Sequence, residues 1–158
     1  MKKILKLSIL LLGALFVLLG CSSETKSEFV LQKTASKTKL TYVYDKEKDS
    51  VSKLTINIIY DITKDKQYTE TVRSQRDEVV SEMDGIEGVT YTKKDDNNYI
   101  TLTVDVDVNK FKFDDMTSRK KAPTLYNTVN AALKRKDNIV SYQLSKEAIL
   151  EYEFKEVK

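Results

Sequence analysis

The sequence predicts an α+β domain with a mostly antiparallel sheet of two hairpins and with helices packed on one face. Apolar residues recur at every second position in 39–45, 53–62 and 99–108, which is typical of strands that bury one face. They recur at intervals of three and four in 66–83 and again after Pro123, which is typical of helices. The strands come in pairs along the chain and the helices follow them, so neighbouring strands are expected to be antiparallel.

The first elements are three expected strands. Residues 28–33 alternate loosely and predict a short strand. The segments 39–45 and 53–62 alternate clearly, and the charged stretch 46–50 between them predicts the turn of a hairpin. Their inward register contains several of the nine tyrosines, and we expect the following to be buried with their hydroxyls near the sheet rim: Tyr42, Tyr44 and Tyr60. A tyrosine-lined groove for a sugar or peptide is the competing interpretation.

A helix is expected over 66–83 and a second hairpin after it. The helix should end at Asp84–Gly85, because Gly85 can adopt the left-handed conformation of a helix cap, and Gly88 can form a further turn. The second hairpin pairs 89–93 with 99–108 across a turn at 95–98.

The remaining elements are shorter. Asp114–Asp115 can start a short helix, since acidic residues suit the first turn. Pro123 must end that helix or begin another, which we expect to extend to about Lys136. A short strand at 139–144 and a final helix capped by Ser145 complete the expected domain.

The N-terminal segment resembles the export signal of a bacterial lipoprotein. Lysines precede an apolar run over 9–19, and the only cysteine closes the sequence Leu18-Leu19-Gly20-Cys21. We expect cleavage between Gly20 and Cys21 and a diacylglycerol, with palmitate-type chains, on the Cys21 sulfur. The apolar run is shorter than the roughly 20 residues of a membrane-spanning helix, so a transmembrane anchor fits less well. An ordinary signal peptide and a free or intermolecular thiol are the other interpretations of Cys21.

The signal defines three expected parts of the chain: a signal peptide at 1–20, a lipidated and polar tether at 21–27, and a single α+β domain at 28–158. Six tether residues span at most about 20 Å, so the domain should lie close to the membrane. The three lysines of 1–20 account for the formal charge of +3, and the remaining chain has 24 basic and 24 acidic residues. A neutral domain gives no reason to expect nucleic acid as a partner.

The composition excludes several classes of catalyst. Without histidine, a Ser-His-Asp or Cys-His nucleophile cannot form, and with Cys21 lipidated no thiolate or zinc-cysteine site remains. There is no glycine-rich phosphate loop. We therefore expect no catalytic residues, no metal site and no cofactor.

Two acidic segments are candidate cation sites. The run 105–109 has the spacing that opens an EF-hand loop, but Lys110 and Met116 replace the glycine and glutamate that such a loop needs. A solvated strand face explains it better. The turn 95–98 offers oxygen ligands, although a hairpin turn of turn-forming residues is the simpler interpretation.

Two basic clusters flank the helix that starts near Pro123. They are Arg119-Lys120-Lys121 and Lys134-Arg135-Lys136. Contact with anionic lipid or wall polymer is one interpretation of these clusters. The balanced total charge favours a solvated surface instead.

The pattern as a whole resembles the YehR-like family of small bacterial lipoproteins. The resemblance rests on the amphipathic helix over 66–83 and on these segments: Leu40–Tyr44, Gly85–Tyr91, Tyr99–Asp105 and Leu144–Glu147. Residues 118–138 differ from the family in being longer and more basic, and the last helix is shorter. The resemblance implies a small α+β domain on a lipid anchor, and it implies no catalytic or ligand-binding residues.

These features predict a non-enzymatic binding or interaction lipoprotein of the cell envelope. The lipid on Cys21 would attach it to the membrane, and a composition rich in Lys, Ile, Asn and Tyr suggests the outer face of a Gram-positive plasma membrane. An envelope protein or a small ligand is the expected partner. The alternative is a carboxylate-based hydrolase or metal-dependent enzyme, which needs two acidic side chains that converge in a pocket.

Overall fold

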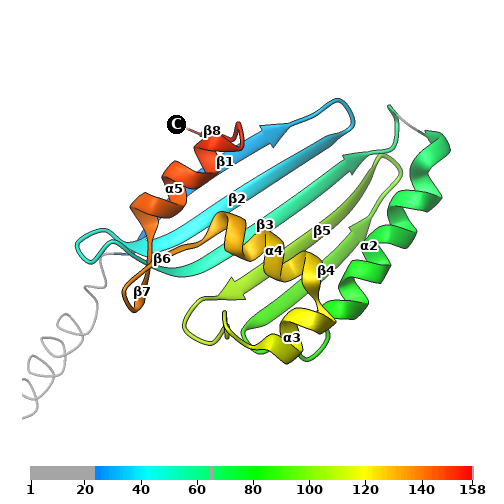
Figure 1. Cartoon of the computed structure of the whole chain (residues 1–158). Coiled ribbons are helices and arrows are strands. Elements are labelled where there is room, and N and C mark those ends of the chain that lie inside the picture. The colour runs from blue at the N-terminus through cyan, green and yellow to red at the C-terminus, as the bar shows by residue number, and fades with distance from the viewer. Residues whose placement is uncertain (1–23, 65, 158) are drawn as a thin grey trace, which may run out of the picture.

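The computed structural model describes residues 24–64 and 66–157 (Figure 1). The predictions for Gly20, Cys21 and the signal segment lie outside these residues. The strands are β1 (Glu24–Gln32), β2 (Ser36–Asp45), β3 (Ser50–Asp61), β4 (Val89–Asp95), β5 (Tyr99–Asp107), β6 (Lys134–Lys136), β7 (Ile139–Ser141) and β8 (Lys155–Glu156). The helices are the 3₁₀ turn η1 (Lys66–Tyr68) and α2 (Thr69–Met83), α3 (Met116–Lys121), α4 (Pro123–Ala132) and α5 (Tyr142–Glu151).

The strands form one open antiparallel sheet, so the α+β class is confirmed. The order across the sheet is β4-β5-β3-β2-β1-β8, with the small β6–β7 hairpin attached to the start of β3 through Ser50 and Ser141. The sheet is therefore larger than the two hairpins that the sequence predicts. β1 pairs with β2 over nine residues, and β8 pairs in turn with Phe29 and Val30 of β1.

The expected tether at 21–27 is too long. β1 begins at Glu24, and Glu24–Ser27 pair with β2 in register with the rest of the strand. The cause is the polar composition of this segment, which hides its period of two: Thr25 and Ser27 take the inward positions that Phe29 takes further along.

One face of the sheet is buried and the other is polar. Alternate side chains of the long strands point into one core, and these are buried: Phe29, Leu40, Tyr42, Leu54, Ile56, Ile100, Leu102, Val104 and Val106. Helical residues complete that core: Val80, Met83, Leu125, Tyr126, Val129, Ala132, Tyr142 and Ile149. The residues between them on the strands are half-buried polar groups such as Thr55, Asn57 and Thr103. Cross-strand contacts link them, including the Asn57 amide that donates to Thr103 Oγ1 at 2.8 Å.

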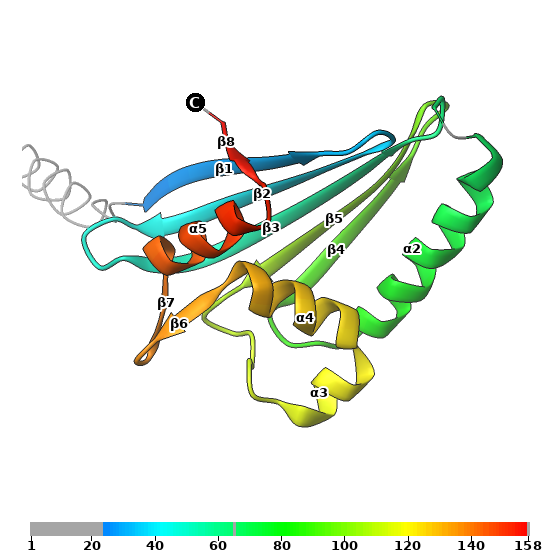
Figure 2. The same ribbon diagram turned by 45° about the horizontal axis from the view of Figure 1, so that its top comes forward.

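The helices lie at different positions across the sheet. α2 follows the β4 side, α5 follows the β1–β2 side, and α4 lies between them (Figures 1 and 2). An ionic network attaches α2 to β4: Arg73 and Arg76 both donate to Asp95, and Asp77 accepts from Lys93. Gly85 has φ of +74° just after α2, as predicted for the helix cap.

The C-terminal third differs most from the expected elements. Asp115 caps α3 by accepting hydrogen bonds from the next turn, and Pro123 is the first residue of α4. α4 ends at Ala132 rather than near Lys136, because Lys134–Lys136 pair with β7 across a turn in which Asp137 has a left-handed φ of 55°.

The cap of α5 is also displaced from the predicted Ser145. Ser141 is the cap, and its hydroxyl accepts from Leu144 N. Ser145 lies one turn inside the helix, fully buried, and its hydroxyl donates to Ser141 O and accepts from Lys134 N. The prediction failed because the pairing of β6 with β7, a tertiary contact, places Ser141 rather than Ser145 at the start of the helix.

None of the helices over 24–64 and 66–157 has the length and apolar character of a membrane-spanning segment.

Candidate functional site

An apolar cleft of about 420 Å³ lies between the sheet and the two C-terminal helices. Its floor comes from β1, β2 and β3, and its walls come from the end of α4 and the end of α5. The lining residues are Leu31, Lys33, Thr38, Leu40, Ile56, Ile58, Thr128, Ala131, Ala132, Ile149, Tyr152, Glu153 and Phe154. The volume falls within the usual range of ligand pockets, about 300–1,000 Å³.

Small side chains of α4 keep this cleft open. Thr128, Ala131 and Ala132 are the α4 residues that line it. The large side chains of the helix, Leu125 and Tyr126, are buried in the core instead. Because alanine and threonine do not reach across to α5, the two helices leave the floor partly uncovered.

The exposure of Ile58 shows where the helices stop covering the sheet. Ile58 belongs to the inward register of β3, next to Ile56, which is 3% exposed. Ile58 is nevertheless 39% exposed. The apolar surface therefore continues from the buried floor out to solvent at the end of the sheet away from Glu24.

The start of α5 is held rigidly on the sheet. Asp49 accepts from the Ser141 hydroxyl and from Gln143 N, the latter at 2.8 Å. Tyr142 stacks on Tyr44 with ring centroids 3.6 Å apart and planes 7° from parallel. Burial, with the Tyr142 hydroxyl next in effect, raises the pKa of Tyr44 to about 12. One wall of the cleft therefore rests on a fixed element.

The end of α5 forms the far wall through a Schellman turn. Glu153 N donates to Leu150 O, and Phe154 N donates to Ile149 O at 3.3 Å. Glu153 occupies the left-handed position, with φ of 67°, where glycine is usual. The turn brings Phe154 back over Ile149, and both side chains line the cleft.

Polar groups occur at the rim of the cleft. Lys33 and Glu153 are exposed, Tyr152 is 57% exposed, and Thr38 is half-buried. Within 24–64 and 66–157, Lys33 has no ion pair and the Thr38 hydroxyl has no hydrogen bond. The rim thus offers an ammonium and a hydroxyl that the fold itself does not use.

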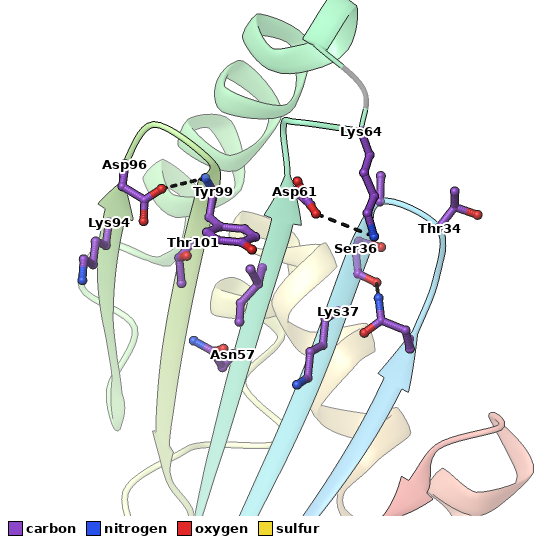
Figure 3. A pocket seen from close by; sticks show the side chains of 13 residues that line it. Thr34, Ser36, Lys37, Asn57, Asp61, Lys64, Lys94, Asp96, Tyr99 and Thr101 are labelled. Atoms are coloured by element: carbon purple, nitrogen blue, oxygen red, sulfur yellow. Dashed lines mark hydrogen bonds and ion pairs between the residues drawn. The ribbon is translucent and has the colours of Figure 1, made fainter.

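A second hollow, of about 500 Å³, is polar and lies on the opposite face of the sheet (Figure 3). The turns after β1, β3 and β4 surround it, and its lining includes Lys37, Asn57, Tyr99 and Thr101. Figure 3 shows Asp61 at the end of β3 and Asp96 on the turn after β4.

Both carboxylates of this hollow support turns. Asp61 accepts from the backbone and hydroxyl of Thr63, and Asp96 accepts from Asn98 N and Tyr99 N. The Thr63 hydroxyl lowers the pKa of Asp61, with smaller help from Lys64. A general acid needs a raised pKa, so this arrangement does not prepare Asp61 for that role.

The predicted acidic segment 105–109 lies on the same polar face, near the start of β3. Asp105 accepts from Thr55 and pairs with Lys53 at 2.9 Å, and Asp107 pairs with Lys110 at 3.1 Å. The lysines satisfy these carboxylates. Across the described part of the chain, no group of three or more histidine, cysteine or acidic side chains is placed to hold a metal ion.

The structure separates the other residues that the sequence selected. Tyr42 and Tyr44 are buried in the core, as predicted, whereas Tyr60 is half-buried. The Tyr42 hydroxyl lies under α4 rather than at the sheet rim, because it donates to Ala132 O at 2.8 Å. Tyr42 and Tyr44 therefore form no open groove. Of the basic clusters, Arg135 pairs with Asp114 at 2.7 Å and lies over the Phe113 ring, whereas Lys120 and Lys136 are exposed.

Sequence reasoning did not find the apolar cleft. A signal was present, because Thr128, Ala131 and Ala132 give one side of the α4 segment small residues. These small residues indicate a cleft only when the position of α5, which forms the other wall, is known. The floor residues Leu40 and Ile56 were predicted as inward, but any half-buried strand would show the same alternation.

Comparisons with known proteins support the fold. No protein-family model matches the sequence, and no curated protein matches it. The NMR structure of Escherichia coli YehR is similar at a TM-score of 0.64 and 18% identity, over 85% of this chain and 91% of that one. The NMR structure of a protein from Streptococcus pneumoniae TIGR4 is similar at a TM-score of 0.55 and 11% identity, over 87% of each chain. The chain therefore has a YehR-like fold, as its sequence resemblance implied.

Proposed function

We propose that the protein is a bacterial surface lipoprotein whose domain is a non-enzymatic binding module, and that the apolar cleft holds its ligand. The observation that carries this proposal is the cleft itself: an aliphatic floor that runs from the buried Leu40 and Ile56 to the exposed Ile58. An exposed apolar surface in a monomer has a cost in water, and such surfaces commonly mark binding sites.

The position of the cleft fits a membrane-anchored binder. Leu31, on its floor, lies seven residues beyond Glu24 along β1, which corresponds to about 23 Å. A lipid on Cys21, three residues before Glu24, would add at most about 10 Å. The anchor and the cleft would then lie at opposite ends of the sheet, with the cleft turned away from the membrane surface.

The arrangement of the helices supports the same proposal. Helices gathered on one face of the sheet would build the cleft between themselves, while the polar face would remain solvated. The neutral charge of residues 21–158 gives no reason for the domain itself to bind the membrane strongly. The lipid would then be the main attachment, and the domain would be free to bind its ligand.

Substitution of the cysteine tests the anchor. Cys21→Ala should release the protein or leave an uncleaved precursor, and it should abolish labelling by a palmitate analogue. Labelling that is unchanged in this variant would refute lipidation at Cys21.

Photocrosslinking in intact membranes tests the binding role. Benzoylphenylalanine in place of Ile58 should yield a defined adduct with a ligand or envelope partner. Ile139, on β7, is the matched control because it is 41% exposed and lies outside the cleft. Absence of an adduct at position 58, or the same adducts at both positions, would contradict a binding site in the cleft.

The alternative is a carboxylate-based enzyme that uses the polar hollow of Figure 3. The presence of Asp61 and Asp96 on one hollow favours it, and the commitment of both to turns argues against it. A hydrolytic activity that is lost in Asp61→Asn, with the fold retained, would establish this alternative.

A further inference from the structure

We infer that the apolar cleft binds a single-chain lipid with a free carboxylate, a fatty acid. This inference rests on the proposed binding role of the cleft and names the chemical class of its ligand. The lining of the cleft, the shape of its opening and the charge at its rim each contribute to the argument.

The interior of the cleft suits a hydrocarbon chain. The buried floor is aliphatic: Leu40 and Ile56 are each 3% exposed, Ala132 is 4% and Ile149 is 1%. The hydroxyl of Thr128 already donates to Thr124 O, so it has no proton left to donate to a ligand. A ligand with polar groups along its length would lose their hydration and find no partner inside.

The opening of the cleft suits a long, thin ligand. Three neighbouring strands about 4.8 Å apart form its floor, so its width is on the order of 10 Å. The apolar floor continues along β3 to Ile58, past the end of α5. A flexible chain can follow such a groove, and each methylene that it buries contributes about 0.8 kcal/mol.

The rim suits a carboxylate at one end of that chain. Lys33 follows β1 at the mouth of the cleft, and Thr38 lies on the neighbouring strand. An ammonium and a hydroxyl can both donate to a carboxylate, and a hydrogen bond between charged groups is the stronger kind. Among the described lining residues, Lys33 is the one cation and Glu153 the one acid, and Glu153 lies just before β8, which pairs with β1. Lys33 is therefore the group with which a carboxylate at the mouth would pair.

A fluorescence experiment can test this on the full-length lipoprotein in phosphatidylcholine vesicles. The sequence contains no tryptophan, so Tyr152→Trp places a single reporter at the rim. The probe is 9,10-dibromostearic acid, whose bromine atoms quench a nearby indole. We expect saturable quenching at position 152 and none in the matched Ile139→Trp protein. Equal quenching at both positions would indicate adsorption from the bilayer and would overturn the inference.

Two further substitutions in the Tyr152→Trp protein identify the groups involved. Ala131 is half-buried and lines the cleft, so Ala131→Phe should fill the cleft and abolish quenching. The circular dichroism spectrum should stay unchanged. Lys33→Gln should raise the half-saturating concentration about tenfold, since one charge-assisted hydrogen bond is lost. Lys37→Gln, on the opposite face, is the control and should have no effect.

The methyl ester of the probe separates this inference from the proposed function. If the ester and the acid quench equally and Lys33→Gln has no effect, carboxylate recognition is refuted while an apolar binding role survives. If neither probe quenches but Ile58 still crosslinks to a partner, the fatty-acid ligand is refuted and the cleft serves another molecule. If crosslinking at Ile58 also fails, the proposed function itself is refuted.

Discussion

The hydrogen bond between Tyr42 and Ala132 gives the sharpest test of how the helices are held on the sheet. Tyr42 is fully buried, and its hydroxyl donates to Ala132 O at 2.8 Å. That carbonyl is in the last turn of α4, where the helix supplies no N–H group to donate to it. Tyr42→Phe keeps the ring and removes the donor, so a buried carbonyl loses its partner.

The expected loss of stability is about 1–3 kcal/mol, the usual cost of an unsatisfied buried acceptor. With an m-value of about 2 kcal/mol/M, a loss of 2 kcal/mol lowers the urea midpoint by about 1 M. The control is Tyr152→Phe, whose ring is 57% exposed and which should change stability by less than about 0.5 kcal/mol. Equal midpoints for the two variants would refute the role assigned to this hydrogen bond.

The stability of the wild type and of Tyr42→Phe at alkaline pH gives a second measure of the same hydrogen bond. Burial raises the pKa of Tyr42 well above 10, its ordinary value, with a smaller effect from Tyr142. A group whose pKa is raised by folding contributes stability below its unfolded pKa and loses it as the pH rises towards the folded pKa. The difference between wild type and Tyr42→Phe should therefore narrow between pH 10 and 12. A difference that widens with pH would contradict the buried, neutral hydroxyl.

Three further predictions concern the turns and the ionic network. Glu153→Gly should stabilise the fold by about 1 kcal/mol in urea unfolding, because the left-handed position then carries no side-chain penalty; a destabilised variant would contradict the Schellman turn. Gly88→Ala should lower the stability more than Gly85→Ala. Both glycines have positive φ, but an added Cβ at Gly88 would lie 2.6 Å from Phe111 N, whereas one at Gly85 would have no atom within 4 Å. Equal losses of stability would refute the close approach at Gly88. Partial burial opposes ionisation of Asp95, yet Arg76 and Arg73 hold its pKa below the ordinary value, so its contribution is lost as the pH falls through the folded pKa. Asp95→Asn should then flatten the stability profile between pH 5 and 2, and an unaltered profile would count against the network.

The elements with strong periodicity were predicted correctly because their register is a local property. In β3 and β5, every second residue from Leu54 and from Ile100 has an apolar or aromatic side chain. Most of these residues are buried in the core, and Ile58 is the one that is exposed. α2 was predicted to end at Asp84–Gly85 because a glycine marks the cap, and it ends there.

The parts that failed depend on contacts distant in sequence. β1 starts in a polar segment that gains its strand structure from pairing with β2. Lys134–Lys136 continue a helical pattern, but the β6–β7 turn at Asp137 and the bond from Lys134 N to Ser145 make them a strand. The cleft could not be predicted because it depends on how far apart α4 and α5 lie.

The pairing of β1 with β2 also has a mechanical consequence for a protein held at one end. β1 enters the sheet at Glu24 and stays paired with β2 over nine consecutive positions. A pull transmitted through residue 24 against a load at the far end acts along the strand, so the hydrogen bonds of that pair are sheared together. Opening them one at a time would require a force across the strand, and tension from an anchor near Glu24 would not supply it. A domain tethered in this way should therefore resist unfolding under drag far better than one pulled through β8, where two paired residues carry the load.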